Sequence, residues 1–169
     1  MTQAITMAIL AMGLVGAPRA KGEVPQTQVR SQDEEAIKRT CLERIARFNR
    51  HEAPLPSAFT EDADFVNVYG MWRRGPAEIE ARQKERMDTV LKEAQIKLLD
   101  LSIRFIRPDV AIVHQTHEMT GMLGADGKTM PPHRELGIRV LVKEQGKWLT
   151  TAFHNTIVRP AALPTRAPE

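Results

Sequence analysis

The stretch VAIVHQTHEM, residues 110–119, decides the fold and the kind of site that this sequence can form. On a helix, His114 and His117 would share one face and could bind one metal ion or one substrate together. On a strand, the two side chains would point to opposite sides of the sheet and could not cooperate. The flanking sequence distinguishes the two possibilities.

From Gln95 onward, apolar and polar residues alternate with the period of two that is typical of strands. IKLLDLSIRFIRP (96–108) ends at a Pro108-Asp109 break, and GADGK (124–128) has the composition of a hairpin turn. ELGIRVLVK, the turn EQGK and WLTTAFHNTIV follow. Residues 110–119 are therefore predicted to form a strand, which excludes a metal ion shared by the two histidines.

Helices are predicted before these strands. Ser31 precedes a run of acidic residues, as an N-cap does, and the helix is expected to run to about Arg50. ADFVNVYG (63–70) resembles a strand, and Gly75-Pro76 opens a second helix with proline at its favoured first position. Helices first and an antiparallel meander last indicate the α+β class. The first helix buries residues at helical spacing: Ile37, Cys41, Ile45 and Phe48.

Composition indicates one domain of 169 residues and argues against nucleic-acid binding. The formal net charge is +3, but 24 Lys and Arg are interspersed with 21 Asp and Glu, and aromatic residues make up only 5%. Nucleic-acid binders usually concentrate basic residues on one face. The single cysteine, Cys41, excludes an internal disulfide and a Cys-rich metal site, and we interpret it as a core residue.

The N-terminus carries an apolar run from Ala4 to Ala17. This run is shorter than a membrane span and resembles the core of a signal peptide (residues 1–22), so the mature protein would begin near Glu23 in the periplasm or outside the cell, without a membrane segment. No Lys or Arg precedes the run, and the alternative is an N-terminal arm on a cytoplasmic protein. Residues 23–30 are interpreted as a linker and the proline-rich residues 160–169 as a disordered tail.

Three segments resemble one known family: DADFVNVYGMWRRGPAEI (62–79), RPDVAIVHQTHEMTG (107–121) and VLVKEQGKWLTTAFHNTIV (140–158). In order and spacing they look like the SnoaL-like superfamily, which has the nuclear transport factor 2-like fold, over residues 31–159. The likeness is greatest to a subfamily of small bacterial proteins first noted in enediyne biosynthetic clusters and often called oxidoreductases. The resemblance implies a cone-shaped, curved antiparallel sheet around N-terminal helices, and dimerisation through the outer sheet face.

The resemblance implies no single activity. The superfamily includes ketosteroid isomerases, scytalone dehydratase, limonene epoxide hydrolase, polyketide cyclases and a kinase association domain that is not an enzyme. No Gly-rich phosphate loop follows a predicted strand, so no cofactor is expected. We therefore expect an apolar pocket for a small hydrophobic or weakly acidic molecule. Whether cofactor-independent acid–base chemistry of the isomerase, cyclase or hydratase type takes place there is left open by the sequence. The alternative is a dimeric ligand-binding or association module without turnover.

The candidate site lies on the inner sheet face. Ala111, Val113, His117 and Met119 form the more apolar face of their strand, which makes His117 the candidate acid or base. If the faces are reversed, Glu118 becomes the candidate base. In the kinase association domain, the residue after the histidine of the last strand and an arginine on the preceding strand face the pocket. The resemblance implies the same for Asn155 and Arg139 here, and because Asn155 is not an arginine, this pocket has one arginine fewer. The candidate ligand-binding residues are Asn67, Tyr69, Trp72, Thr151, Phe153 and Asn155.

Each of these candidates also has a purely structural interpretation, as core packing, an interior histidine or an ion pair. A closed pocket with a hydrogen-bonded His117 would favour an enzyme, and a cavity filled by side chains would favour the association module. The outer face, which the resemblance implies for a homodimer, is expected to carry His114, Thr116, Trp148, Thr150 and His154.

Overall fold

The computed structural model describes residues 26–159, which form two helices, a short 3-10 turn and six strands. The predicted signal peptide and the predicted tail lie outside the described residues. In chain order the elements are α1 (Gln26–Asn49), η1 (Pro56–Ala58), β1 (Phe59–Val66), β2 (Trp72–Arg74), α2 (Pro76–Met87), β3 (Gln95–Arg107), β4 (Val110–Thr120), β5 (His133–Glu144) and β6 (Lys147–Ile157).

Helix α1 begins earlier than predicted. It starts at Gln26, so residues 26–30 are helical rather than a linker, and Ser31 lies inside the helix instead of capping it. Asp33, read in the sequence as a first-turn acid, is buried. Its Oδ1 accepts hydrogen bonds from Lys143 Nζ at 2.6 Å and from Trp148 Nε1 at 3.1 Å. These contacts to the far end of the sheet hold the first turns of α1 in place.

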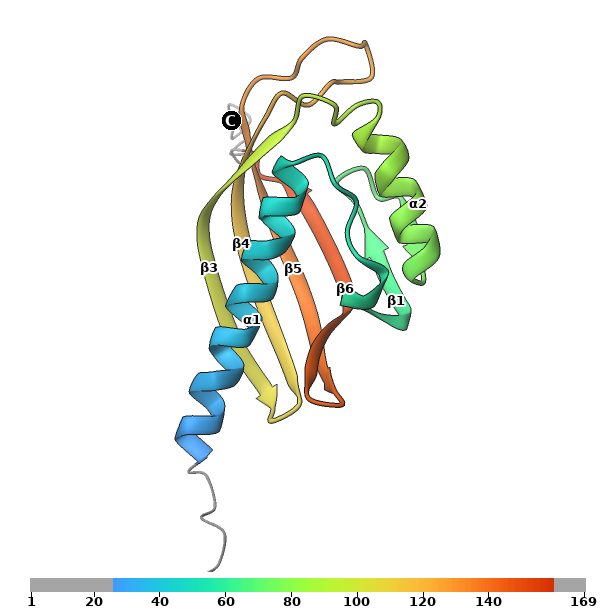
Figure 1. The fold of residues 1–169 in the computed structure, drawn as a ribbon. Helices are drawn as coiled ribbons and strands as arrows, with labels where there is room; N and C mark the ends of the chain where they lie inside the picture. The colour runs from blue at the N-terminus through green and yellow to red at the C-terminus, as the bar shows by residue number, and fades with distance from the viewer. Residues whose placement is uncertain (1–25, 160–169) are drawn as a thin grey trace, which may run out of the picture.

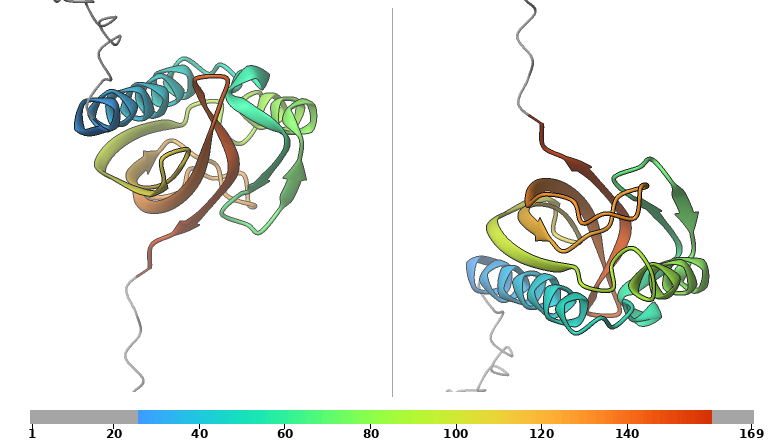
Figure 2. Two further views of the ribbon diagram at one scale, coloured as in Figure 1. Left: turned by 90° about the horizontal axis from the view of Figure 1, so that it is seen from below. Right: turned by 90° about the horizontal axis from the view of Figure 1, so that it is seen from above.

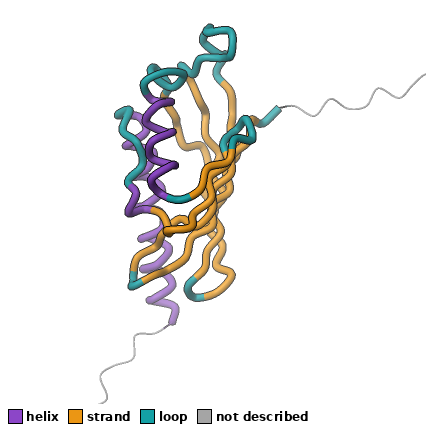
Figure 3. The backbone as a smooth tube through the Cα atoms, turned by 90° about the vertical axis from the view of Figure 1, so that its right-hand side faces the viewer, coloured by secondary structure: helices purple, strands orange, loops and turns teal. Residues whose placement is uncertain are grey.

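The six strands form one curved, unclosed sheet in the order β2-β1-β6-β5-β4-β3 (Figure 1). All neighbours are antiparallel except β1 and β6, which are parallel, so the sheet is mixed rather than purely antiparallel. Both helices lie on one side of this sheet (Figure 3), and the end-on views show the strands curving beside them (Figure 2). The predicted α+β class is confirmed.

Strand β1 ends at Val66, four residues before the predicted end at Gly70. The reason is a turn that Asn67 stabilises. Its Oδ1 accepts hydrogen bonds from the backbone N–H of Tyr69 at 3.0 Å and of Met71 at 3.1 Å. An asparagine that bonds to the backbone two residues on is a common turn device, and here it ends the strand.

Strand β6 departs from strict alternation. Leu141 pairs with Thr150 while the preceding Val140 pairs with Ala152, so Thr151 is an extra residue in β6. A bulge of this kind changes which residues face inward. Trp148 and Thr150 are buried, and Phe153 is buried beyond the bulge. The predicted alternation is therefore wrong here: Trp148 and Thr150 belong inside, and Thr151 does not share their face.

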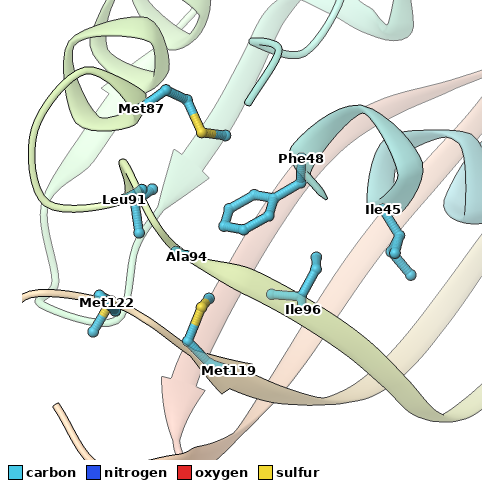
Figure 4. Close-up of a cluster of buried hydrophobic side chains, with 8 residues drawn as sticks. All are labelled: Ile45, Phe48, Met87, Leu91, Ala94, Ile96, Met119 and Met122. Carbon is cyan, nitrogen blue, oxygen red and sulfur yellow. The ribbon is translucent and has the colours of Figure 1, made fainter. Parts of the chain in front are cut away.

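Apolar clusters hold the helices on the sheet. Ile37 and Cys41 of α1 pack with Ala111, Val113, Leu141 and Trp148. The far end of α1 contributes Ile45 and Phe48 to the cluster in Figure 4, which also contains Met87, Leu91, Ala94, Ile96, Met119 and Met122. Ile79 seats α2 against Phe59 and Ala63. None of the helices in residues 26–159 is long and apolar enough to cross a membrane.

Candidate functional site

The two faces of β4 separate its histidines as the strand prediction requires. His117 is 3% exposed on the inner face, next to Met119 and the fully buried Gln115. His114 is exposed on the outer face, and Glu118, the base expected for reversed faces, also lies outward. Within residues 26–159, no three His, Cys, Asp or Glu side chains are grouped to hold a metal ion. Of the two histidines of β4, His117 is therefore the one that can take part in an interior site.

Glu135 is a site residue that the sequence interpretation missed. It lies directly across from His117 on β5 and is 3% exposed. Its Oε2 accepts a hydrogen bond of 2.6 Å from Asn155 Nδ2, and its Oε1 lies 3.5 Å from His133 Nε2. The signal was present, because Glu135 is two and four residues from Gly137 and Arg139, which share its strand face.

Two arginines lie beside this group. Arg139 is 3% exposed, and its Nη1 donates a hydrogen bond of 2.8 Å to Thr150 Oγ1. Arg44, which the sequence interpretation also missed, comes from α1. The guanidinium carbons of Arg139 and Arg44 lie 4.5 Å and 5.7 Å from the centre of the Phe153 ring, within the range of a cation–π interaction. Neither arginine forms an ion pair with another described residue.

Burial and like charge determine the protonation of the interior. Burial, then the positive charges of Arg44 and Arg139, lower the pKa of His117 from 6.5 to about 4. His117 is therefore neutral at pH 7. Burial, then Arg44, lowers the pKa of Arg139 to about 9, so that guanidinium stays charged at neutral pH. The interior thus combines two guanidinium groups, the Glu135 side chain and a neutral imidazole.

Several buried polar atoms of this interior have no hydrogen-bond partner among the described residues. They belong to five residues that face the same region: Arg44 Nε, Gln115 Nε2 and Oε1, His117 Nε2, Arg139 Nε and Nη2, and Asn155 Oδ1. Native proteins leave few buried polar atoms unpaired, because each one costs free energy. These atoms can form hydrogen bonds with water or with a polar group of a ligand.

A cavity of about 60 Å³, which we call the inner cavity, is lined by three of these residues, Arg44, His117 and Asn155. Candidates that the structure brings together there are His117, Asn67, Phe153 and Asn155. Arg139 lines a neighbouring small cavity with Arg44 and Thr150. The rest of the inner cavity's lining is mostly apolar and comes from Phe48, Phe65, Val68, Leu91, Ile96, Met119 and Met122, with Arg44, Gln83, Arg86 and Glu135.

Three candidates lie elsewhere. Tyr69 and Trp72 are 51% and 57% exposed and do not line the inner cavity. Trp72 Nε1 instead donates a hydrogen bond of 2.7 Å to Asp64 Oδ1, and the Tyr69 ring lies under the Arg86 guanidinium. Thr151 is displaced by the bulge in β6. After the turn at Asn67, Val68 still lines the inner cavity, whereas Tyr69 and Trp72 do not.

No family model and no curated protein matches this sequence, whereas solved structures do. An uncharacterised protein with a cystatin-like fold from Caulobacter vibrioides is 27% identical, with a TM-score of 0.70 over 78% of this chain and 93% of that one. A putative scytalone dehydratase from Novosphingobium aromaticivorans is 17% identical, with a TM-score of 0.63 over 84% and 99%.

A nuclear transport factor 2-like protein with a cystatin-like fold, also from a Novosphingobium aromaticivorans strain, is 14% identical, with a TM-score of 0.66 over 80% of this chain and 89% of that one. This chain therefore has the cystatin-like, nuclear transport factor 2-like fold. The fold that the SnoaL-like resemblance implies is confirmed.

Proposed function

We propose that this protein binds a small, largely apolar molecule that carries a carboxylate or another weakly acidic group, and that His117 acts on it as a general base. The observation that supports this most is the pair Arg44 and Arg139 beside a neutral histidine. Arg44 Nε and Arg139 Nε and Nη2 are buried and have no partner among the described residues. A ligand anion would supply the missing acceptors and balance the excess positive charge.

The apolar lining explains why the rest of the ligand is apolar. Phe48, Phe65, Met119 and Phe153 offer hydrophobic surface around the polar group. A pocket that is mostly apolar with a few convergent polar groups is the usual form of a small-molecule site. Glu135 and Asn155 form a fixed pair at its edge, and this pair orients the Asn155 side chain. The site thus combines an apolar wall with a cationic end.

Acid–base chemistry follows from the state of His117. A neutral imidazole can accept a proton from a carbon or hydroxyl of the ligand and return it at another position, as an isomerisation, cyclisation or hydration requires. A bound anion would offset the positive charges of Arg44 and Arg139, and so would raise the pKa of His117 toward its ordinary value. The ligand itself would then strengthen the base that acts on it.

Matched ligands and variants test this function. Isothermal titration and thermal unfolding would compare small carboxylic acids with their neutral amides in wild type, Arg44→Gln, His117→Ala and His114→Ala. We expect the acids alone to stabilise wild type and His114→Ala, by about 2.7 kcal/mol at a hundredfold excess over Kd. Arg44→Gln and His117→Ala should lose this stabilisation. Equal binding of acids and amides would refute the anionic ligand.

Association through the outer sheet face is a second proposal, supported by exposed apolar residues there. Leu136 and Ile138 are 40% and 38% exposed, and Ile138 lies between His114 and His154 on adjacent strands. Trp148 and Thr150, which are buried inside, have no part in it. Light scattering should give a dimer for wild type, weaker association for His114→Ala and a monomer for Ile138→Glu. A monomeric wild type at micromolar concentration would exclude this interface.

A further inference from the structure

A second cavity, of about 140 Å³, lies between α2 and the β1–β2 turn; we call it the outer cavity. In Figure 1, α2 lies beside β1 at the edge of the sheet. The outer cavity has Met71 and Ile79 in its wall, and its charged lining includes Arg73 and the ion pair of Arg82 with Glu85. It is larger than the inner cavity, and neither Tyr69 nor Trp72 lines it.

The two cavities share part of their walls. Phe65, Asn67, Gln83 and Arg86 line both, so these residues form a partition between them. Phe65 is fixed, because its ring packs on Phe153 with centroids 5.0 Å apart. The long side chains of Gln83 and Arg86 form no hydrogen bond or ion pair with another described residue. Arg86 makes a cation–π contact with the Tyr69 ring, whose centre lies 5.7 Å from the guanidinium carbon. The α2 side of the partition is therefore held by fewer polar contacts.

The inward face of α2 is unusual at this point. Ile79 and Met87 are buried at its two ends, and Gln83 lies midway between them, one helical turn from each. A helix that only packed on the core would have an apolar residue at this position. The polar Gln83 side chain packs less well on the core than an apolar one would. Instead, it forms a part of the partition that a ligand could displace. The partition coincides with the place where the two cavities meet.

We propose that the inner and outer cavities are two compartments of one ligand site, and that the ligand is an elongated acid. This inference rests on the proposed function. The acid group lies in the inner cavity near Arg44 and His117. The apolar body passes between Gln83 and Phe65, displaces the Gln83 and Arg86 side chains, and ends against Met71 and Ile79. Acids too short to cross the partition use the inner cavity alone.

Titration calorimetry with acetate, butanoate, hexanoate and octanoate tests the proposal on the full chain. In wild type, each methylene that enters the outer cavity should raise affinity about fourfold, so octanoate should bind at least tenfold more tightly than butanoate. Met71→Trp fills the outer cavity from its exposed edge and should weaken octanoate at least tenfold, while acetate changes less than twofold. Gln83→Ala opens the partition and should tighten octanoate but not acetate.

Lys84→Ala is the matched control, because Lys84 is an exposed residue of the same helix that lines neither cavity. It should bind every acid as wild type does, and thermal unfolding of each variant would verify its fold. If Arg44→Gln abolishes acetate binding while Met71→Trp leaves octanoate unchanged, the proposed function holds and the two-compartment site is wrong. If no acid binds wild type, the proposed function fails and this inference fails with it.

Discussion

The inner faces of β4 and β5 have an apolar half and a polar half that lie on the same two strands. In the apolar half, Ala111, Val113 and Leu141 are completely buried against α1. In the polar half, His117 faces Glu135 and Gln115 faces Gly137, with Arg139 next along the inner face of β5. Several side-chain atoms of Gln115, His117 and Arg139 lack partners among the described residues. Both halves are equally inaccessible to solvent. On these two strands, therefore, the first half stabilises the fold by apolar packing, whereas the second half remains polar at a cost in stability.

The largest expected effect is the loss of stability from a substitution in the apolar half, compared with a substitution on the outer face of the same strand. Leu141→Ala removes a fully buried side chain from the cluster of Ile37, Cys41 and Trp148, and should lower the free energy of unfolding by about 2–5 kcal/mol. Val142→Ala, on the outer face of the same strand, should cost about 1 kcal/mol or less. Urea unfolding measures both. Equal losses would mean that the apolar half is not the main source of stability.

Acid should destabilise the protein through the polar half. His117 has a pKa of about 4 in the folded protein against 6.5 ordinarily. Between these values the unfolded chain takes up a proton at His117 that the folded protein does not, so stability at this site is lost as the pH falls through this range. The loss should be on the order of 3 kcal/mol by pH 4.

His117→Gln should remove this part of the pH dependence, and His114→Gln, at an exposed position, should leave it as in wild type. Urea unfolding at pH 7, 6, 5 and 4 would measure the pH dependence of stability in wild type and in each variant. A His117→Gln variant with the wild-type pH profile would show that the burial of His117 is relieved at low pH, and would remove the argument for a neutral base.

The smallest expected effect has the opposite sign. Gln115 is completely buried, and neither of its side-chain polar atoms has a partner among the described residues. Gln115→Met keeps the approximate shape and should raise the free energy of unfolding by about 1–2 kcal/mol. Thermal and urea unfolding in ligand-free buffer would measure it. A destabilised variant would mean that Gln115 is paired in solution and that the polar half costs little stability.

Much of the fold followed from local patterns. The period of two in residues 110–119 assigned His117 and His114 to opposite faces, because successive side chains of a strand always alternate. The spacing of Ile37, Cys41, Ile45 and Phe48 identified the buried face of α1, and Pro76 marked the start of α2. These assignments needed only the geometry of a single helix or strand.

The site needed the tertiary structure. Strand pairing places the bulge at Thr151 and turns Trp148 and Thr150 inward, and no pattern within β6 reveals it. Arg44 lies beside an apolar stripe, where a charged residue usually points to solvent, and only the packing of α1 on the sheet brings it to Arg139 and Phe153. Alternation and helical spacing determine which way a side chain points from its own element. Which side chains then meet depends on contacts between residues far apart in the chain, and the sequence pattern of one element contains no information about them.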